Sequence, residues 1–289
     1  MNVNVNCSDF LMIAQLSCLD SISEPEMLAL TTIAATALNV GHPRGVQFKL
    51  AAARCSGTRA VAVDDKAEVE EYFNNEGFNR WSRIYSDDGE VNTVQLDIRE
   101  GHAQTVDKVL GWVDADGSAK RGETFADAGC GVGSLSLPLA QRGAKVTASD
   151  ISAAMVEEAA KRAAKVGLSD RASFSTSDLE NIKGKYDTVT CIDVMIHYPQ
   201  DKMAQMVQGL AQKADKRLII SFAPDTWYYR ALKSFGELFP GPSKTTRAYL
   251  HSEEAVVEAL NAAGFELART EMTGTKFYFS RLLEAKKRA

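Results

Sequence analysis

The pattern of apolar and polar positions changes near residue 63. Residues 1–63 are rich in Ala, Ser, Thr and Val and show no clear amphipathic repeat. Across residues 64–289, short apolar runs alternate with segments whose apolar residues recur at helical spacing. This alternation predicts one α/β domain with a doubly wound, mostly parallel sheet. Seven strands are expected: one that starts at Phe125, followed by residues 145–149, 172–176, 186–192, 217–222, 266–272 and 275–282.

Helices are expected between these strands and before the first of them. Ser152 and Gly167 are suited to begin and end one of these helices. The longest helix is expected to begin at Asn92 and to be followed by a polar loop over residues 114–123. Its apolar stripe is expected to consist of Leu96, Val106, Val109, Leu110 and Val113. The other expected helices cover residues 66–73, 134–142, 153–166, 203–212 and 252–263, and the last two strands form a hairpin.

Residues 1–63 are interpreted as a leader that lies outside the folded domain. From Met27 to residue 63 every charged residue is basic, which is typical of an organelle transit peptide. All the acids of the leader precede Met27, so translation is hypothesised to start at Met27, with residues 1–26 as an upstream extension. An ordinary disordered N-terminal tail is the alternative.

A glycine-rich turn follows the strand that starts at Phe125. Gly129, Gly131 and Gly133 alternate with other residues directly before a predicted helix. Glycines let backbone N–H groups approach a ligand, and the helix N-terminus behind them favours negative or polar groups. About 20 residues later Asp150 ends the next strand, where a carboxylate can accept hydrogen bonds from ribose hydroxyls. These features predict a site for a nucleoside-containing cofactor.

Spacing and charge favour S-adenosylmethionine over NAD as that cofactor. The glycines follow the pattern G-x-G-x-G, whereas dinucleotide folds use G-x-G-x-x-G. Asp127, two residues before Gly129, would repel a pyrophosphate and attract the ammonium group of a methionine. S-adenosylmethionine carries such a group and no phosphate. A glycine turn that binds no ligand is the alternative.

The residues after each parallel strand supply the other candidates, because ligands lie beyond the carboxyl ends of such strands. Asp178 is expected to accept from the adenine amino group and the Leu179 amide to donate to the ring, although Asp178 could instead cap a turn. His197 follows the fourth strand and is expected to face the substrate. The complete predicted cofactor set is Asp127, Gly129, Cys130, Gly131, Gly133, Asp150, Ile151, Asp178, Leu179 and Asp193.

These placements divide the domain into four regions. A helical arm over residues 64–122 could cover the site as a lid, and residues 123–222 form the cofactor-binding core. A cap insertion over residues 223–251 contains many aromatic residues, which could wall a ligand or pack the cap onto the sheet. Residues 252–289 hold the last helix and the hairpin.

Composition narrows the function further. Lys and Arg number 33 against 38 Asp and Glu, which gives no strong electrostatic footprint for nucleic acid. The five cysteines include no C-x-x-C pair, and no His or acid pair has metal-ligand spacing, so neither a structural zinc nor a catalytic metal is expected. No uninterrupted apolar run reaches the roughly 20 residues of a membrane span.

Four longer motifs resemble those of the magnesium-protoporphyrin IX O-methyltransferases of chloroplasts, which belong to the class I S-adenosylmethionine-dependent methyltransferases. The glycine turn indicates only the superfamily, whereas the aromatic and arginine-rich arm and the Pro-Gly-Pro-Ser-Lys insertion resemble the family. The four motifs cover residues 78–85, 127–133, 194–199 and 239–249.

The resemblance implies methylation of one propionate of magnesium-protoporphyrin IX in chlorophyll biosynthesis, with magnesium present only in the substrate. It implies Tyr85 and His197 as the active-site pair. It also implies a chloroplast location on the stroma side of the envelope and thylakoid membranes, through peripheral contact, and the large subunit of magnesium chelatase as a partner. A quinone-type methyltransferase and a non-catalytic regulatory protein that binds a porphyrin are the alternatives.

Overall fold

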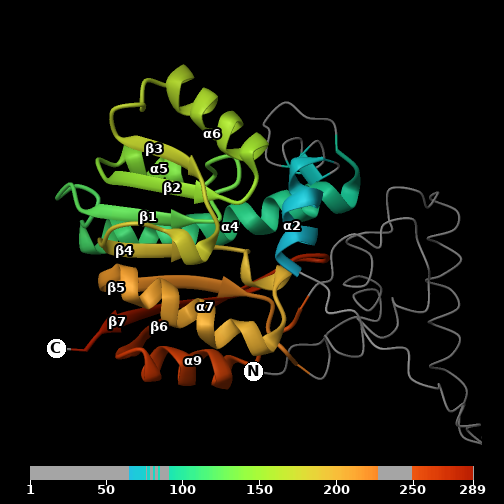
Figure 1. Ribbon diagram of the computed structural model, residues 1–289, viewed down its shortest axis with the longest axis vertical. Coiled ribbons are helices and arrows are strands. Elements are labelled where there is room, and N and C mark those ends of the chain that lie inside the picture. Colours follow the sequence, from blue (N-terminus) through green and yellow to red (C-terminus); the bar gives the residue numbers. More distant parts are fainter. Residues whose placement is uncertain are drawn as a thin grey trace, which may run out of the picture.

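The computed structural model describes residues 65–75, 77–78, 81, 84, 91–226 and 249–288. These residues contain one seven-stranded sheet in the order β3-β2-β1-β4-β5-β7-β6 (Figure 1). Strands β1 to β5 run parallel to one another, and β7 lies antiparallel between β5 and β6. The predicted α/β fold with a mostly parallel seven-stranded sheet is therefore confirmed. The strands are β1 (Thr124–Ala128), β2 (Lys145–Asp150), β3 (Ala172–Thr176), β4 (Tyr186–Cys191), β5 (Ala214–Phe222), β6 (Phe265–Gly274) and β7 (Phe279–Lys287).

The helices cover both faces of this sheet, as expected for a doubly wound fold. Helices α7 and α9 pack on one face together with the small side chains of Ala126 and Ala128, and α4 and α5 pack on the other with Phe125 (Figure 1). Neighbouring residues of β1 thus point into different cores, which is the period of two that a strand buried on both faces requires. The helices are α2 (Asp65–Asn74), α4 (Thr93–Asp116), α5 (Ser136–Gln141), α6 (Ala153–Lys165), α7 (Gln200–Lys213) and α9 (Glu253–Ala262), with short 3₁₀ helices η3 (Leu179–Asn181) and η4 (Met195–His197).

Helix α4 begins where the sequence predicts but differs in two details. Asn92 and Gln95 form a capping box, in which each side chain accepts from the other residue's backbone N–H. The predicted stripe was wrong at Leu96, which is 41% exposed, because Leu96 lies about 200° around the helix from the buried Val94. The predicted loop from residue 114 was also wrong at its start, since the helix continues to Asp116 before Gly117 ends it at φ 68°.

Strand β7 begins four residues later than predicted. Asp97 of α4 accepts hydrogen bonds from the Thr275 hydroxyl at 2.6 Å and from the Phe277 amide at 2.7 Å, and this holds residues 275–278 in a turn. The strand then extends through the charged residues up to Lys287, because Glu284 is fully buried in ion pairs with Arg217 and Arg269. The pattern of apolar residues could not indicate a buried carboxylate.

Several predictions concern residues outside the described part of the chain. These are the leader, the hypothesised start at Met27, Tyr85, and most of the cap insertion, of which only residues 223–226 and 249–251 are described. Within the described residues, no helix is both long enough and apolar enough to span a membrane.

Candidate active site

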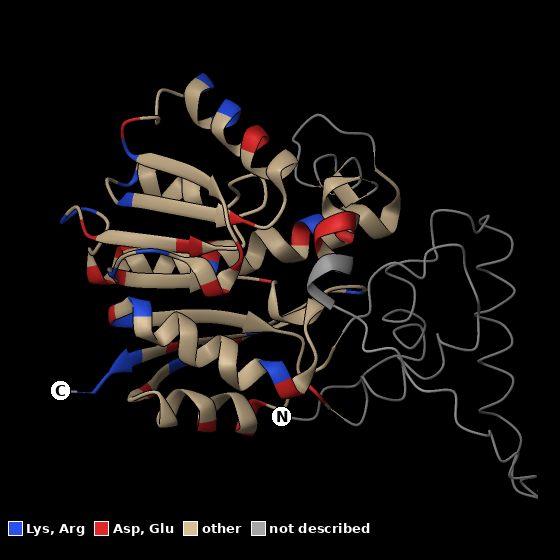
Figure 2. Ribbon diagram, in the orientation of Figure 1, with Lys and Arg blue, Asp and Glu red and all other residues tan. Residues whose placement is uncertain are grey.

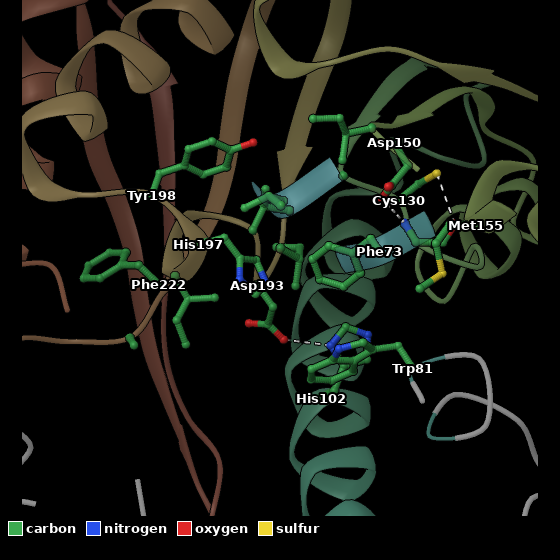
Figure 3. Close-up of a pocket in the computed structure, with 18 of the residues that line it drawn as sticks. Phe73, Trp81, His102, Cys130, Asp150, Met155, Asp193, His197, Tyr198 and Phe222 are labelled. Carbon is green, nitrogen blue, oxygen red and sulfur yellow. Dashed lines mark hydrogen bonds and ion pairs between the residues drawn. The ribbon is translucent and has the colours of Figure 1, made fainter. Parts of the chain in front are cut away.

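A pocket opens at the carboxyl ends of the parallel strands, where the sequence placed it. Residues from the β1, β2, β3 and β4 ends form its floor, and α2, α4 and the turn before β7 contribute its sides (Figure 3). The wall is mostly apolar, with aromatic rings from Tyr72, Phe73, Trp81, Tyr198 and Phe222. Of the predicted residues, Gly129, Cys130, Gly131, Asp150, Ile151, Asp178, Leu179, Asp193 and His197 line this pocket, whereas Asp127 and Gly133 do not.

The glycine turn after β1 has the geometry that a closely bound ligand requires. Gly129 has φ 78°, and a Cβ atom there would lie 2.2 Å from Val194 Cγ2, so no larger residue fits. Gly131 has φ 52°, and a Cβ atom there would meet no described atom within 4 Å, so its backbone faces open space. Gly133 has φ 88° and faces Leu137 of α5, which explains why it does not line the pocket.

Asp150 connects the glycine turn to the next loop. Its Oδ2 accepts from the Gly131 amide and its Oδ1 from the Ser152 amide, both at 2.9 Å. Each carboxylate oxygen can accept a further hydrogen bond, so Asp150 can still bind two donors of a ligand. Burial raises the pKa of Asp150, although the hydrogen bonds from Ser152 and Gly131 act in the opposite direction.

Unlike the other predicted acids, Asp127 does not line the pocket. Its carboxylate is buried in the sheet, where it accepts hydrogen bonds from Ser136 at 2.5 Å and from Thr190 at 2.8 Å. Burial raises the pKa of Asp127, and these two hydrogen bonds oppose the shift. The side chain therefore links β1 to α5 and β4 by hydrogen bonds and stabilises the glycine turn that follows β1.

Cys130 and Asp178 line the pocket with different chemistry. Burial, reinforced by Asp127 and Asp150, raises the pKa of the Cys130 thiol well above its usual value, so this residue is a neutral part of the wall. Asp178 accepts from the backbone amide of Asn181 at 2.9 Å and from its side chain at 3.0 Å, and so caps η3. Asp178 therefore caps a turn, as the alternative prediction states, and it also lines the pocket.

Asp193 lies at the centre of a polar cluster that the sequence did not reveal. It has φ 59°, which is uncommon for a residue other than glycine. Its Oδ2 is 2.7 Å from His102 Nδ1 and accepts from the Tyr278 hydroxyl at 2.7 Å (Figure 3). Its Oδ1 accepts from Ser221 at 2.8 Å and Ser280 at 3.1 Å.

The charge state of Asp193 follows from these contacts. Burial alone would raise its pKa, but the hydrogen bond and charge of His102, together with the hydroxyls of Tyr278 and Ser221, lower the pKa below its usual value. Asp193 is therefore an ionised carboxylate. His102 and Tyr278 also line the pocket and were missed. The one signal for His102 in the sequence is its place on the same face of α4 as Ile98 and Val106.

His197 ends η4 and lies in the pocket beside the arm. Its ring meets Phe73 of α2 edge to face, with 5.1 Å between the ring centroids. Burial lowers the pKa of His197 to about 4, although the charge of Asp193 opposes the shift, so the ring is neutral at pH 7. Its Nδ1 is buried and has no hydrogen-bond partner among the described residues. A ligand that enters the pocket can supply the hydrogen bond that this buried atom lacks.

The described residues contain no group of three or more His, Cys, Asp or Glu side chains that could hold a metal ion. The polar groups of the pocket include backbone amides, carboxylates, hydroxyls and two imidazoles, and these suit an organic cofactor and an organic substrate.

The sheet order, the antiparallel β7, the glycine turn and the acid after β2 together define a class I S-adenosylmethionine-dependent methyltransferase. A methyltransferase-domain family matches residues 125–214, and a family described as the magnesium-protoporphyrin IX methyltransferase C-terminus matches residues 191–287. The chain belongs to the magnesium-protoporphyrin O-methyltransferase family.

The relatives that establish this membership cover nearly the whole described part of the chain. The chain is 56% identical over 226 residues to the magnesium-protoporphyrin O-methyltransferase of Synechocystis, covering 78% of this chain and 97% of the relative. It is 55% identical to the chloroplastic magnesium protoporphyrin IX methyltransferase of Arabidopsis thaliana, covering 78% of this chain and 72% of that relative. A crystal structure of the Synechocystis enzyme with bound SAH matches with a TM-score of 0.71 and 53% identity, covering 78% of this chain and all of that one.

Proposed function

We propose that this protein transfers a methyl group from S-adenosylmethionine to a propionate carboxylate of magnesium-protoporphyrin IX, giving the monomethyl ester in chlorophyll biosynthesis. The observation that carries the proposal is a single pocket that joins a nucleoside site, at Gly131 and Asp150, to an aromatic wall around a neutral histidine, His197. The names of the Synechocystis and Arabidopsis relatives agree with it.

The nucleoside side of the pocket fits S-adenosylmethionine. The free acceptor positions of Asp150 suit the two ribose hydroxyls, and Asp178 with Leu179 suits the adenine edge. Gly129, Cys130, Gly131 and Ile151 line the remaining floor, while Gly133 shapes the turn and Asp127 supports it. When bound, S-adenosylmethionine supplies an activated methyl group on a sulfonium.

The aromatic side of the pocket suits a large flat apolar molecule. Phe73 and Trp81 come from the arm, Phe222 from the end of β5 and Tyr198 from the residue after η4, so aromatic residues contribute to the wall on more than one side (Figure 3). Such residues bind a porphyrin disc through apolar contact, while a few polar groups set its orientation. The magnesium ion belongs to the substrate.

The chemistry requires orientation more than acid–base catalysis. A propionate has a pKa near that of Glu, about 4.3, so it is ionised at neutral pH and needs no strong base. A neutral His197 can donate one hydrogen bond that orients the carboxylate and can exclude water from it. We assign Tyr85, which lies outside the described residues, as the second orienting residue on the basis of the family resemblance.

The cellular setting is proposed from the same relationship. The Arabidopsis relative is named chloroplastic, which supports a chloroplast location for this protein. The finer proposals are a position on the stroma side, peripheral contact with the envelope and thylakoid membranes, and association with the large subunit of magnesium chelatase.

One assay tests the proposed function. The purified protein is incubated with S-adenosylmethionine and magnesium-protoporphyrin IX, and the monomethyl ester is measured by chromatography. We expect the monomethyl ester of magnesium-protoporphyrin IX to form, with one ester for each methyl group transferred. If the protein binds the cofactor but methylates neither magnesium-protoporphyrin IX nor a quinone-type acceptor, the result would instead favour a regulatory protein. Methyl transfer to a quinone alone would favour the quinone-type alternative.

A further inference from the structure

The pocket offers many acids but few groups that can become cationic. Asp150, Asp178 and Asp193 line it, and the described lining residues include no Lys or Arg. Figure 2 shows acidic residues at several strand ends near α2. The only described lining side chains that can carry a positive charge are those of His102 and His197. A substrate carboxylate that meets this described part of the wall needs a cationic partner there, because an unpaired carboxylate is costly in an apolar pocket.

The two histidines differ in their ability to supply that charge. Burial keeps His197 neutral, as described above. His102 Nδ1 instead lies 2.7 Å from the ionised carboxylate of Asp193. Because a carboxylate only accepts hydrogen bonds, His102 must donate its Nδ1 hydrogen to Asp193.

A line of hydroxyl groups leads to the same oxygen of Asp193 that contacts His102. The Tyr278 hydroxyl, which donates to Asp193, is 2.9 Å from Thr105 Oγ1, and this atom is 2.9 Å from Thr273 Oγ1. The half-buried Lys108 donates to Thr273 Oγ1 at 2.8 Å. Each hydroxyl can accept one hydrogen bond and donate the next toward Asp193. The carboxylate is thus fixed in position and can orient the His102 ring.

The reaction itself indicates which carboxylate a cation should bind. The carboxylate that receives the methyl group loses its charge during the transfer, so an ion pair with it would stabilise the bound substrate more than the transition state. An ion pair with the other carboxylate is equally strong throughout the reaction and only aids binding and orientation. A neutral donor suits the first carboxylate and a cation suits the second.

We propose that protonated His102, oriented by Asp193, binds the propionate that is not methylated, while neutral His197 faces the propionate that is. The proposal rests on the proposed function and deepens it. As the substrate enters, His102 takes its second proton from solvent, and no covalent bond to carbon forms or breaks at this position. His102 thus acts as a substrate-binding residue and Asp193 as a positioning residue.

The test compares three ligands that differ only in their free carboxylates. These are magnesium-protoporphyrin IX, its monomethyl ester and its dimethyl ester. Dissociation constants are measured by porphyrin fluorescence with the whole chain saturated with S-adenosylhomocysteine, so that no methyl group can be transferred. In His102→Asn, the amide can still donate to Asp193 but the second ring nitrogen is missing. Gln104→Asn, on an exposed position of α4, is the matched control.

The expected result for His102→Asn is about tenfold weaker binding of the two ligands that keep a free carboxylate and unchanged binding of the dimethyl ester. Equal weakening of all three ligands would show a structural role. Weakening for magnesium-protoporphyrin alone would show that His102 meets the reacting carboxylate. Either outcome overturns the proposal, as does no change at all.

A second measurement avoids substitution in case the variant does not fold. Nitrogen nuclear magnetic resonance reports the protonation of the four histidines in the wild-type chain. One histidine should become doubly protonated with the monomethyl ester and not with the dimethyl ester, and the absence of this difference overturns the proposal. Failure of the proposed function is recognised separately, as no ester formed by the wild-type protein with S-adenosylmethionine.

Discussion

The two histidines of the pocket show what single residues reveal from sequence. The place of His197 in the pocket could be predicted because it follows a strand whose carboxyl end faces the pocket. His102 could not, because its partner Asp193 is 91 residues away and the contact depends on the rotation of α4 about its axis. Asp127 could be identified as part of the glycine-turn motif. The sequence cannot show that two hydroxyls from other elements donate hydrogen bonds to its carboxylate.

Asp150→Ala should weaken cofactor binding. The substitution removes the proposed acceptor for the ribose and also the hydrogen bond that holds the Gly131 amide at 2.9 Å. We expect the dissociation constant for S-adenosylhomocysteine, measured by calorimetry, to rise at least about tenfold. Asp170→Ala, in an exposed turn before β3, is the control and should bind as the wild type does. Unchanged binding by Asp150→Ala would contradict the assignment.

His197 should make stability depend on pH. Its pKa in the folded protein is about 4, below the unfolded value of 6.5, so the unfolded chain binds a proton that the folded chain does not as pH falls between these values. The free energy of unfolding should therefore decrease relative to His197→Asn, by up to about 3 kcal/mol from pH 7 to pH 4. Urea unfolding of both proteins across this range measures the difference. Parallel pH profiles would mean that the ring is not desolvated in the fold.

At the scale of elements, Ser152 links the arm to the cofactor-binding core. Its hydroxyl donates to the Phe73 carbonyl of α2 at 2.9 Å and also accepts from the Met155 amide, which caps α6. Its own amide donates to Asp150. Because Phe73 also contacts His197, one serine connects the cofactor side of the pocket to the substrate side.

Ser152→Ala should loosen α2. The loss of the cap should lower the free energy of unfolding by about 1 kcal/mol, and the loss of the bond to Phe73 should speed amide hydrogen exchange in α2. Ser252→Ala is a matched control, because Ser252 caps α9 by accepting from the Ala255 amide at 3.0 Å. The control should lose similar stability without faster exchange in α2. Equal exchange in the two variants would rule out the link.

The sequence predicted the elements better than their ends. All seven strands and the main helices have local causes, such as β-branched runs and the caps Asn92 and Ser152, and these could be recognised. The ends of β7 depend on Asp97 and on the buried ion pair of Glu284, which are tertiary contacts. The four-region division of the domain stays a prediction.

At the scale of the whole molecule, the two ends of the sheet hold charges in different ways. The pocket end holds acids that can meet a ligand. Near the amino end of β5, Arg217 is buried and pairs with Asp116 of α4 and with Glu284 of β7, while Arg269 of β6 pairs with Glu284 at 2.6 Å. This cluster joins α4 to three neighbouring strands and has a structural role.

Glu284→Gln should test that role. The substitution leaves Arg217 and Arg269 without a charged partner in β7, so the free energy of unfolding should fall by about 3 kcal/mol. Affinity for S-adenosylhomocysteine should be unchanged at a temperature where the variant is folded, because Arg217 lies near the strand end away from the pocket. Glu266→Gln, exposed on β6, is the control for stability. A stable Glu284→Gln protein would show that the cluster contributes little.

The position of β7 inside the sheet has a consequence for folding. Its residues follow those of every other strand in the sequence, yet it separates β5 from β6 and brings Ser280 to Asp193, with Tyr278 just before it. Contacts across such sequence separations form late and slowly. During synthesis on the ribosome, the polar cluster around Asp193 can therefore be completed only after β7 has emerged.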